Sequence, residues 1–586
     1  MIMMLFLELA QTFKEMETTS SRIALTQFLV ELLKKTPVDI IDKIIYLIQG
    51  KLGPDHSSKE LGIAEKMVIR SLSIVTGNSS NEIQLLYNRI GDLGDVAYHL
   101  RYNRVQSTLF QEHLTVEKVF DTMVKIANTS GTGSLDLKRR YITSMLNNSS
   151  NLEAKYLLKL VLGTLRLGIA NYTLIDALAL SFTGDKKNKS ILENAFNLSS
   201  DLGNIARILA KGSIKDVQVI AVSLFVPVRP MLAERARDSR EALNKMKGEC
   251  FAEFKIDGER VQIHKKGNQI ELFTRSLENI TPHFPEIVKM FADENTDNFI
   301  VEGEVVAINS TNLKYLPFQS LMKRKRKHEI QDAMEKYPVL LNLFDLLYYN
   351  GQDTMELSFF ERRRLLEDAF GNIKNDRLKL VDQTKVSTID EIEKFMTKAL
   401  ENGCEGLMLK DPSSRYRAGA REWAWIKLKR EYSGTITDSL DLVILGALYG
   451  KGRRVGKYGA LLLGSYSKTE DSFYTICKVG TGFKDDVLTA LSNRLNKLVI
   501  HKKHPRVEAG ALSMDVWFEP NIILEIVTSE ITLSPVYTTG RNLIKPGYGF
   551  ALRFPKFTGN VRDDKAPEDT TTVDEVLNIY SNQLKQ

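Results

Sequence analysis

The stretch CFAEFKIDGERVQIHKKGNQIELFTRS, residues 250–276, decides the fold of the middle of the chain. Short runs of alternating side chains are separated by two turn signals, Asp257-Gly258 and Lys266-Gly267-Asn268, a pattern typical of consecutive β-strands. Alternation along the first strand places Glu253 and Lys255 on one face and apolar side chains on the other. We therefore expect Lys255 to project from the end of a rigid strand, just before a turn. Taken alone, the motif also fits a charged hairpin tip.

On either side of this stretch the pattern changes, which predicts three domains. Residues 1–222 carry apolar side chains at three- and four-residue spacing, which predicts an all-α domain. A segment with two prolines opens a central α+β domain, 223–432, with helices expected at about 357–370 and 389–401. The last region, 433–586, is rich in strand-like runs and ends in a short helical pattern. A five-stranded Greek-key barrel of the OB-fold type fits its length and texture.

Composition and charge are those of a globular protein with a mildly basic surface. The chain has 586 residues, of which 43% are hydrophobic and 26% charged, an ordinary mix for about three or four packed domains. The net charge of +7 suits a polyanionic partner, but it suits a slightly basic enzyme equally well.

The cysteines and apolar segments exclude several classes of protein. Cys250, Cys404 and Cys477 lie far apart, so neither a disulfide framework nor a zinc site is expected, which suits a reducing interior such as cytoplasm. The most apolar stretch, 156–170, contains two basic residues and is shorter than the roughly 20 residues of a membrane span. We expect it to form a buried core helix. The N-terminus lacks the basic region of a signal peptide.

Two carboxylates, Glu302 and Glu304, share one face of the apolar run NFIVEGEVVAI, residues 298–308. Carboxylates in an apolar strand are costly unless they meet a cation or a donor, so a metal, a sugar hydroxyl or a structural ion pair is expected beside them. Phe344 and Glu405 are weaker signals taken alone. Phe344 lies in an apolar run, where core packing is a sufficient explanation.

A cationic cluster closes the central region. In REWAWIKLK, residues 421–429, strand alternation places Trp425, Lys427 and Lys429 on one face, and Arg421 lies just upstream. Two lysines side by side repel one another, and an anion between them removes that repulsion. The cluster therefore predicts a binding site for an anion.

In their order along the chain, these segments resemble the covalent nucleotidyltransferases, and specifically the ATP-dependent DNA ligases of archaeal type. The resemblance covers nearly the whole chain. Two departures are mild: Glu302 stands where the family often has Asp, and Lys556 where it often has Arg. The matching segments are KIDGER (255–260), TRSLEN (274–279), VEGEVVA (301–307), FDLLYYNG (344–351), EGLMLK (405–410), WIKLK (425–429) and RFPKFTGNVRDDK (553–565).

The resemblance implies the chemistry of the site. Lys255 attacks the α-phosphate of ATP, for which its amine must be uncharged; an ordinary lysine has a pKa of about 10.4, and neighbouring cations favour the neutral form. The resemblance places Glu253 at the adenine with Phe344 stacked on the base, and Arg260, Arg275 and Glu304 at the ribose. It places Glu304 and Glu405 at Mg²⁺ or Mn²⁺, and Arg421, Lys427 and Lys429 at the phosphates. It places four C-terminal residues over the pyrophosphate: Arg553, Arg562, Asp563 and Lys565.

The resemblance also implies the partners. The implied substrate is nicked double-stranded DNA, which the helical domain holds through its phosphates. The implied processes are DNA replication, repair and recombination. The C-terminal barrel swings away to admit the DNA. A sliding clamp is a candidate partner, and a monomer located in the cytoplasm at the nucleoid, without membrane contact, is expected. The run Lys323–Lys327 fits either a DNA contact or a solvated charged turn.

Three alternatives differ from this hypothesis in class. An RNA ligase or an mRNA capping enzyme shares the lysine motif, although the long helical region argues against a capping enzyme. An NAD-dependent ligase carries a four-cysteine zinc module, which three scattered cysteines cannot supply. A DNA-binding protein without activity is disfavoured by the intact Lys255 and carboxylate segments. A P-loop ATPase is excluded because the sequence contains no Walker A motif.

Overall fold

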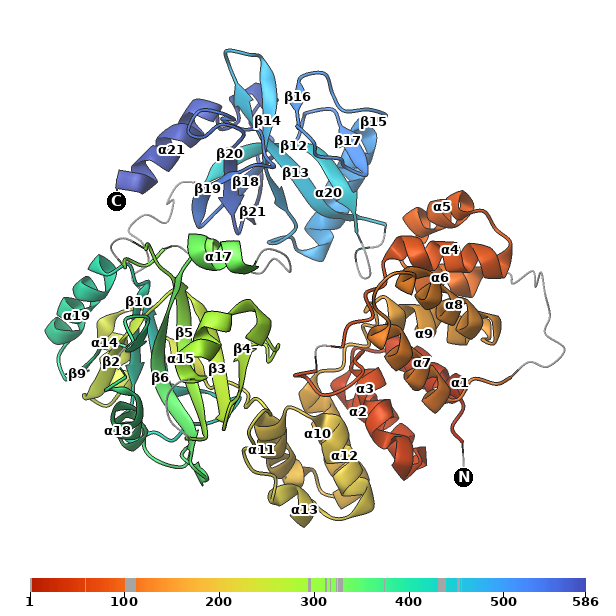
Figure 1. Ribbon diagram of the computed structural model, residues 1–586. Helices are drawn as coiled ribbons and strands as arrows, with labels where there is room; N and C mark the ends of the chain where they lie inside the picture. The colour runs from red at the N-terminus through yellow and green to blue at the C-terminus, as the bar shows by residue number, and fades with distance from the viewer. Residues whose placement is uncertain are drawn as a thin grey trace. The chain divides into compact units, whose positions relative to one another are not determined.

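The chain divides into two compact units, Met1–Ser71 with Gln106–Arg430, and Leu72–Val105 with Glu431–Gln586 (Figure 1). The computed structural model describes residues 3–57, 59–100, 112–292, 297–310, 313–316, 318–322, 324, 330–373, 375–429, 439–450, 454 and 456–585.

The N-terminal region is built of helices, as predicted. Side chains define their starts: Ser21 accepts a hydrogen bond from the Ala24 amide, and Thr115 from that of Lys118. The apolar faces are buried at helical spacing. The helices are α1 (Phe6–Glu17), α2 (Arg22–Lys35), α3 (Ile41–Ile48), α4 (Glu65–Thr76), α5 (Ser80–Ile90), α6 (Leu93–His99), α7 (Val116–Asn128), α8 (Ser134–Asn147), α9 (Asn151–Val161), α10 (Asn171–Thr183), α11 (Lys189–Ser199), α12 (Leu202–Lys211) and α13 (Ile214–Gln218).

One expected helix in this region is shorter than its sequence pattern suggested. The apolar stretch 156–170 is helical only as far as Val161, the last residue of α9, although Leu167 beyond it is also buried. Gly163 then adopts a φ of 64°, a left-handed conformation that ends helices and that glycine enters without a steric penalty. The described residues contain no helix that is both long and apolar enough to cross a membrane.

The central region contains two β-sheets. The first has the strand order β1-β11-β10-β2-β9, and in the second β4-β3-β5-β6-β7 is extended by β8, which pairs with β6. The strands are β1 (Leu232–Arg235), β2 (Cys250–Lys255), β3 (Glu259–Lys266), β4 (Gln269–Thr274), β5 (Phe299–Ala307), β6 (Val339–Tyr349), β7 (Gln352–Asp353), β8 (Leu378–Leu380), β9 (Gln383–Val386), β10 (Gly406–Lys410) and β11 (Arg421–Lys429).

Helices accompany the two central sheets. The predicted helices near 357–370 and 389–401 are present as α18 and α19, and α19 packs on β2 and β10. Each sheet has its own apolar core. The helices are α14 (Ser239–Lys245), α15 (Pro285–Ala292), α16 (Phe318–Met322), α17 (Ile330–Lys336), α18 (Phe359–Phe370) and α19 (Ile389–Glu401).

The turn Asp257-Gly258 is not a hairpin. β2 pairs with β10 and β9, whereas β3 pairs with β4 and β5, so the turn carries the chain from one sheet to the other. A side chain at Gly258 would collide with the carbonyl oxygen of Val305, which explains why glycine occupies this position. The alternative of a charged hairpin tip at Lys255 is therefore wrong, and the lysine lies where the two sheets meet.

The C-terminal region is strand-rich, as predicted. Its main sheet has the order β15-β17-β12-β13-β14-β16, β18 pairs with β12 and β21, and β19 pairs with β20. The elements are β12 (Leu440–Tyr449), β13 (Tyr458–Ser467), β14 (Ser472–Val479), α20 (Asp485–Leu495), β15 (Val499–Ile500), β16 (Val507–Glu508), β17 (Val516–Phe518), β18 (Ile523–Val527), β19 (Glu530–Ser534), β20 (Gly549–Arg553), β21 (Lys556–Val561) and α21 (Val573–Lys585).

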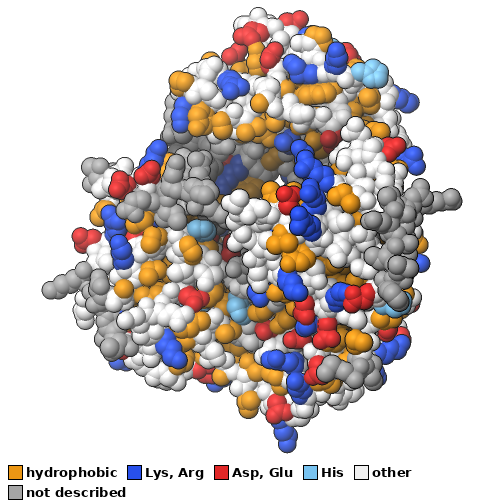
Figure 2. All heavy atoms as spheres, turned by 45° about the vertical axis from the view of Figure 1, so that its right-hand side comes forward, with side chains coloured by type: hydrophobic (Ala, Val, Ile, Leu, Met, Phe, Trp, Pro, Cys, Tyr) orange, Lys and Arg blue, Asp and Glu red, His pale blue; other side chains and the backbone are white. Residues whose placement is uncertain are grey.

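Surface charge and cysteines agree with the composition. On the face drawn in Figure 2, Lys and Arg side chains are interspersed with Asp and Glu, as the modest excess of positive charge implies. Cys250, Cys404 and Cys477 are all free and buried.

Candidate active site

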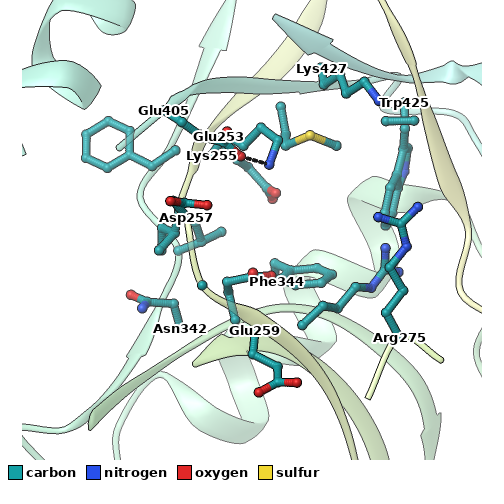
Figure 3. Close-up of a pocket in the computed structure, with 18 of the residues that line it drawn as sticks. Glu253, Lys255, Asp257, Glu259, Arg275, Asn342, Phe344, Glu405, Trp425 and Lys427 are labelled. Atoms are coloured by element: carbon teal, nitrogen blue, oxygen red, sulfur yellow. Dashed lines mark hydrogen bonds and ion pairs between the residues drawn. The ribbon is translucent and has the colours of Figure 1, made fainter. Parts of the chain in front are cut away.

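Lys255 is the last residue of β2, and its side chain reaches a pocket of about 620 Å³. The antiparallel register with β10 sets Lys255 opposite Gly406 and Glu253 opposite Met408. Because alternate residues share a face, Glu253 and Lys255 both line this pocket, as their spacing predicts. Figure 3 shows Lys255 beside Glu405, with Phe344 across the opening.

At the pocket rim, the carboxylate of Glu405 lies between two lysines. One oxygen accepts from the Lys255 ammonium and the other from that of Lys429. Burial would raise the pKa of Glu405, but the charges of the two lysines outweigh it and the net pKa is lowered. The side chains of Lys255, Glu405 and Lys429 are 22%, 19% and 40% exposed, so water and substrate can reach this triad.

Glu302 and Glu304 have different surroundings, although they share a strand. Glu302 is buried and pairs with Arg260, with 2.7 Å between its Oε2 and the Arg260 Nη2, and it also accepts from the Tyr416 hydroxyl at 2.9 Å. Glu304 lines the pocket, where burial raises its pKa to about 7 against the opposing charges of Lys255 and Arg260. Glu302 therefore forms the structural ion pair, and Glu304 is the carboxylate available to a ligand.

The inner end of the pocket is aromatic. Phe344 and Trp425 line it with their rings edge to face, 6.3 Å apart. The Arg260 guanidinium lies 5.3 Å from the Phe344 ring centroid, so Arg260 reaches this end rather than the rim. Glu253 is nearly fully buried there and accepts from Gln383 at 3.0 Å. An apolar slot with a carboxylate at its end suits a planar base that carries a donor.

Sequence reasoning did not assign a role to one residue of this inner end. Lys410 is 1% exposed, lines the pocket, and forms a 2.7 Å ion pair with Glu253. Burial lowers its pKa, although the charge of Glu253 opposes this effect. A lysine in the otherwise apolar run GLMLK was the available signal, since a buried ammonium requires a partner.

The pocket lining also contains cationic side chains. Arg275, Arg421 and Lys427 all line the pocket, as the sequence predicts. Partial burial lowers the pKa of Lys427, and the charges of Arg421, Lys255 and Lys429 lower it further. Lys429 turns instead to Glu405. Cations that destabilise one another in this way favour a bound anion such as a polyphosphate.

Comparisons with known proteins identify the family. Models described as "ATP dependent DNA ligase domain", "DNA ligase N terminus" and "ATP dependent DNA ligase C terminal region" match residues 230–429, 5–179 and 454–565. A DNA ligase of Nitrosopumilus maritimus is 48% identical over 578 residues, 98% of each chain, and one of Cenarchaeum symbiosum is 47% identical over 584 residues, 99% of this chain and 98% of the relative. The chain belongs to the ATP-dependent DNA ligases.

A solved structure supports the same fold for this ligase. The structure named Pmar-Lig_PreS3 superposes with a TM-score of 0.54 at 17% identity, covering 94% of this chain and 98% of the other. The membership of the family also implies use of ATP and places the chain among enzymes that act on DNA.

The four C-terminal residues of the predicted site lie in the second unit of the ligase, each with a partner there. Arg553 pairs with Glu530 at 2.6 Å, and the Asp563 carboxylate pairs with Arg494 at 2.6 Å. Arg562 and Lys565 both pair with Asp441, at 2.8 and 2.7 Å.

The basic run Lys323–Lys327 is described only at Arg324. This side chain is buried, pairs with Glu286, and donates to the Tyr337 carbonyl at 3.2 Å. For Arg324, neither a solvated turn nor a DNA contact is therefore the right interpretation. Lys323 and the residues 325–327 lie outside the described part of the chain.

The donor set of the pocket fits a divalent cation shared with a nucleotide. Among the described residues, no cluster of three or more His, Cys, Asp or Glu side chains could hold a metal. Two pocket carboxylates, Glu304 and Glu405, are close enough for the charge of one to raise the pKa of the other. Mg²⁺ is commonly bound by one or two carboxylates together with substrate phosphates, so these two residues are sufficient.

Proposed function

We propose that this ligase seals nicks in duplex DNA through a covalent lysyl-AMP on Lys255. The observation that carries the proposal is the placement of the Lys255 amine. It lies at the end of a strand, in a pocket lined by the aromatic side chains of Phe344 and Trp425 and by the cationic side chains of Arg275, Arg421 and Lys427. We assign Lys255 as the nucleophile, Glu253 and Phe344 to the adenine, and Arg260, Arg275 and Glu304 to the ribose.

In the first step the Lys255 nitrogen attacks the α-phosphorus of ATP, the bond to the β-phosphate breaks, and pyrophosphate leaves. The amine must first lose a proton and separate from Glu405, its partner in the free protein. Arg421, Lys427 and Lys429 balance the charge of the phosphates, so catalysis comes mainly from positioning and electrostatic stabilisation.

Glu304 and Glu405 would hold Mg²⁺, or Mn²⁺, which supplies charge neutralisation at the phosphates when bound. Because the pKa of Glu304 is near 7, this carboxylate is only partly ionised in the free protein at neutral pH. A bound cation favours its ionised form. Glu405, which contacts Lys255 and Lys429 in the free protein, would be the second carboxylate that holds the metal.

In the second step the 5′-phosphate of the nick attacks the AMP phosphorus and releases Lys255. In the third, the 3′-hydroxyl attacks the adenylylated 5′-phosphate and AMP leaves. We assign residues 1–222 to DNA binding, 223–432 to adenylation, and 433–586 to an OB-fold domain that closes during step one. Closure brings Arg553, Arg562, Asp563 and Lys565 to the pyrophosphate and requires new partners for these side chains.

The proposed biological setting is that of the family. A ligase of this kind acts in replication, repair and recombination, as a monomer at the nucleoid in the cytoplasm. A sliding clamp is the candidate that would recruit it to nicks. These assignments rest on the family resemblance of the whole chain.

Two assays test the proposal. Incubation with α-labelled ATP and Mg²⁺ should attach label to the wild-type protein but not to Lys255→Ala. Sealing of nicked DNA should then follow without further nucleotide. Sealing of RNA ends in preference to a DNA nick would support an RNA ligase, and absence of label would support a DNA-binding protein without activity.

A further inference from the structure

A buried lysine lies behind the carboxylate that we assign to the adenine. The Lys410 Nζ is 2.7 Å from the Glu253 Oε2 and 3.4 Å from the carbonyl oxygen of Phe344. It is also 4.4 Å from the ring centroid of Trp425 and 4.6 Å from that of Phe359. Aromatic faces stabilise a desolvated cation, so this site is built for a charged ammonium.

The surrounding charges leave Lys410 as the main counterion of Glu253. On the other carboxylate oxygen, Oε1, Glu253 accepts from Gln383 at 3.0 Å, and the nearest Arg363 nitrogen lies 3.8 Å away. Asp345 also acts on Lys410, but it is paired with Arg362 through two contacts, of 2.7 and 3.1 Å. Lys410 is therefore the nearer of the two cations beside Glu253, and the only one of the two within hydrogen-bond distance of its carboxylate.

Ionisation decides what a carboxyl group can recognise. A carboxylate is an acceptor only, with about four lone-pair sites on its two oxygens, whereas the protonated form also donates. Lys410 and Gln383 take one site on each oxygen of Glu253, so acceptor capacity remains. The 6-amino group of adenine donates to such an acceptor, while the 6-oxo group of guanine or hypoxanthine does not.

We propose that Lys410 is a specificity-positioning residue: its ammonium binds Oε2 of Glu253 and fixes this carboxylate as an acceptor facing the base, so that the pocket accepts 6-amino purines and rejects 6-oxo purines. The inference rests on the proposed function, because it concerns the nucleotide that reaches Lys255. Lys410 acts through Glu253 and does not touch the reacting atoms. Without this ion pair, the carboxylate of Glu253 is no longer held in one orientation, and its acceptor oxygen no longer selects the 6-amino group.

The test measures labelling of Lys255 with α-labelled ATP and with α-labelled GTP, as a ratio of the two efficiencies. In Lys410→Met we expect the preference for ATP to fall by about tenfold or more, the value of one charged hydrogen bond. This loss should appear mainly as a higher ATP concentration for half-maximal labelling. Lys385→Met is the matched control: Lys385 lies on neighbouring β9, is exposed, and pairs with Glu249, so the ratio should not change.

The maximal rate of labelling separates this role from a structural one. In a folded Lys410→Met the maximal rate with ATP should stay close to that of the wild type, because Lys410 does not touch the reacting atoms. A folded Lys410→Met with the wild-type ratio of ATP to GTP labelling would overturn the proposal.

A second route does not depend on the folding of Lys410→Met. Glu253→Gln, which can donate as well as accept, should lose the preference, and adding Lys410→Met to it should cause no further loss. This double variant leaves no unpaired buried charge. A retained preference in Glu253→Gln, or an additional loss in the double variant, would contradict the inference. Absence of any label in the wild type would instead contradict the proposed function.

Discussion

Two lysine–carboxylate groups in the same pocket differ in burial, and the difference separates recognition from chemistry. At the rim, the side chains of Lys255, Glu405 and Lys429 are between 19% and 40% exposed. At the inner end, those of Glu253 and Lys410 are 3% and 1% exposed. In both groups the lysines and carboxylates neutralise one another in the free protein. Only the rim group, around Glu405, is exposed enough to exchange these contacts for contacts with a ligand.

The energetic consequences of this contrast are large. Water reaches the ion pairs of Glu405 and weakens them, so Glu405 can exchange lysines for another cation at a lower cost than a fully buried group. Breaking a buried pair by removing one partner costs about 3–5 kcal/mol, so the inner end stays as it is through the reaction. Groups that must move lie at the rim, and groups that define the shape of the pocket lie inside.

The most disruptive change at the rim is removal of the nucleophile. In Lys255→Ala we expect covalent labelling and nick sealing to fall by roughly 10⁴-fold or more, as for loss of other nucleophiles. Stability should change little, because the pair with Glu405 is partly exposed. The measurements are labelling with α-labelled ATP and sealing of a nicked duplex. Residual labelling at the wild-type rate would mean that another residue carries the AMP.

The inner end should respond through stability instead. Arg362 is fully buried and binds Asp345 with two nitrogens, next to the Lys410 site. Arg362→Met should lower the free energy of unfolding by about 3–5 kcal/mol, because it removes the cation that is hydrogen-bonded to the buried Asp345 carboxylate. Urea unfolding followed by tryptophan fluorescence is a suitable measurement, since Trp423 and Trp425 lie on β11.

The control for this prediction is the double variant Arg362→Met/Asp345→Leu. Removal of both charges leaves no unpaired group, so it should recover a large part of the lost stability. Equal destabilisation in the single and double variants would show that the packing of Arg362, rather than its charge, is what matters.

Local patterns in the sequence predicted much of this site. Alternation alone placed Glu253 and Lys255 on the pocket face of β2, and the turn signals bounded β2, β3 and β4 correctly. The reason is that strand periodicity and turn chemistry depend on neighbouring residues. The three broad regions, helical, mixed and strand-rich, were predicted on the same basis.

Contacts between distant segments were not predictable. Glu302 and Glu304 are equivalent in the sequence pattern, yet only Glu302 meets Arg260 in an ion pair. Lys410 gained a role only once the register set β10 beside β2. The turn at Asp257-Gly258 looked like a hairpin because the sequence does not show which sheet the next strand joins.

Glu304 belongs neither to the exposed rim group nor to the buried Glu253–Lys410 pair, and its protonation should make stability depend on pH. In the folded protein the pKa of Glu304 is about 7, whereas an unperturbed glutamate has a pKa of 4.5. The neutral form of Glu304 therefore contributes fully to stability below pH 4.5, and this contribution is lost as the pH rises through 7. Glu304→Gln stays neutral, and above pH 7 it should be more stable than the wild type by at most about 3 kcal/mol. Labelling should nevertheless fall, because the amide cannot replace an ionised carboxylate.

Thermal unfolding of the nucleotide-free protein at pH 5 and pH 8 would measure this effect. The gain in midpoint for Glu304→Gln should be present at pH 8 and small at pH 5. An equal difference at both pH values would show that Glu304 does not titrate in the folded state over this range.

The smallest effect on stability is expected at the most exposed member of the rim group. Lys429→Met removes one of two cations from Glu405, whose other partner, Lys255, remains. The free energy of unfolding should therefore change by less than about 1 kcal/mol, similar to Lys385→Met on the surface. Labelling, in contrast, should require more ATP in Lys429→Met only, because a cation assigned to the phosphates is lost. If Lys429→Met instead destabilised the protein as strongly as Arg362→Met, the rim would be as rigid as the inner end, and the separation of recognition from chemistry by burial would not hold.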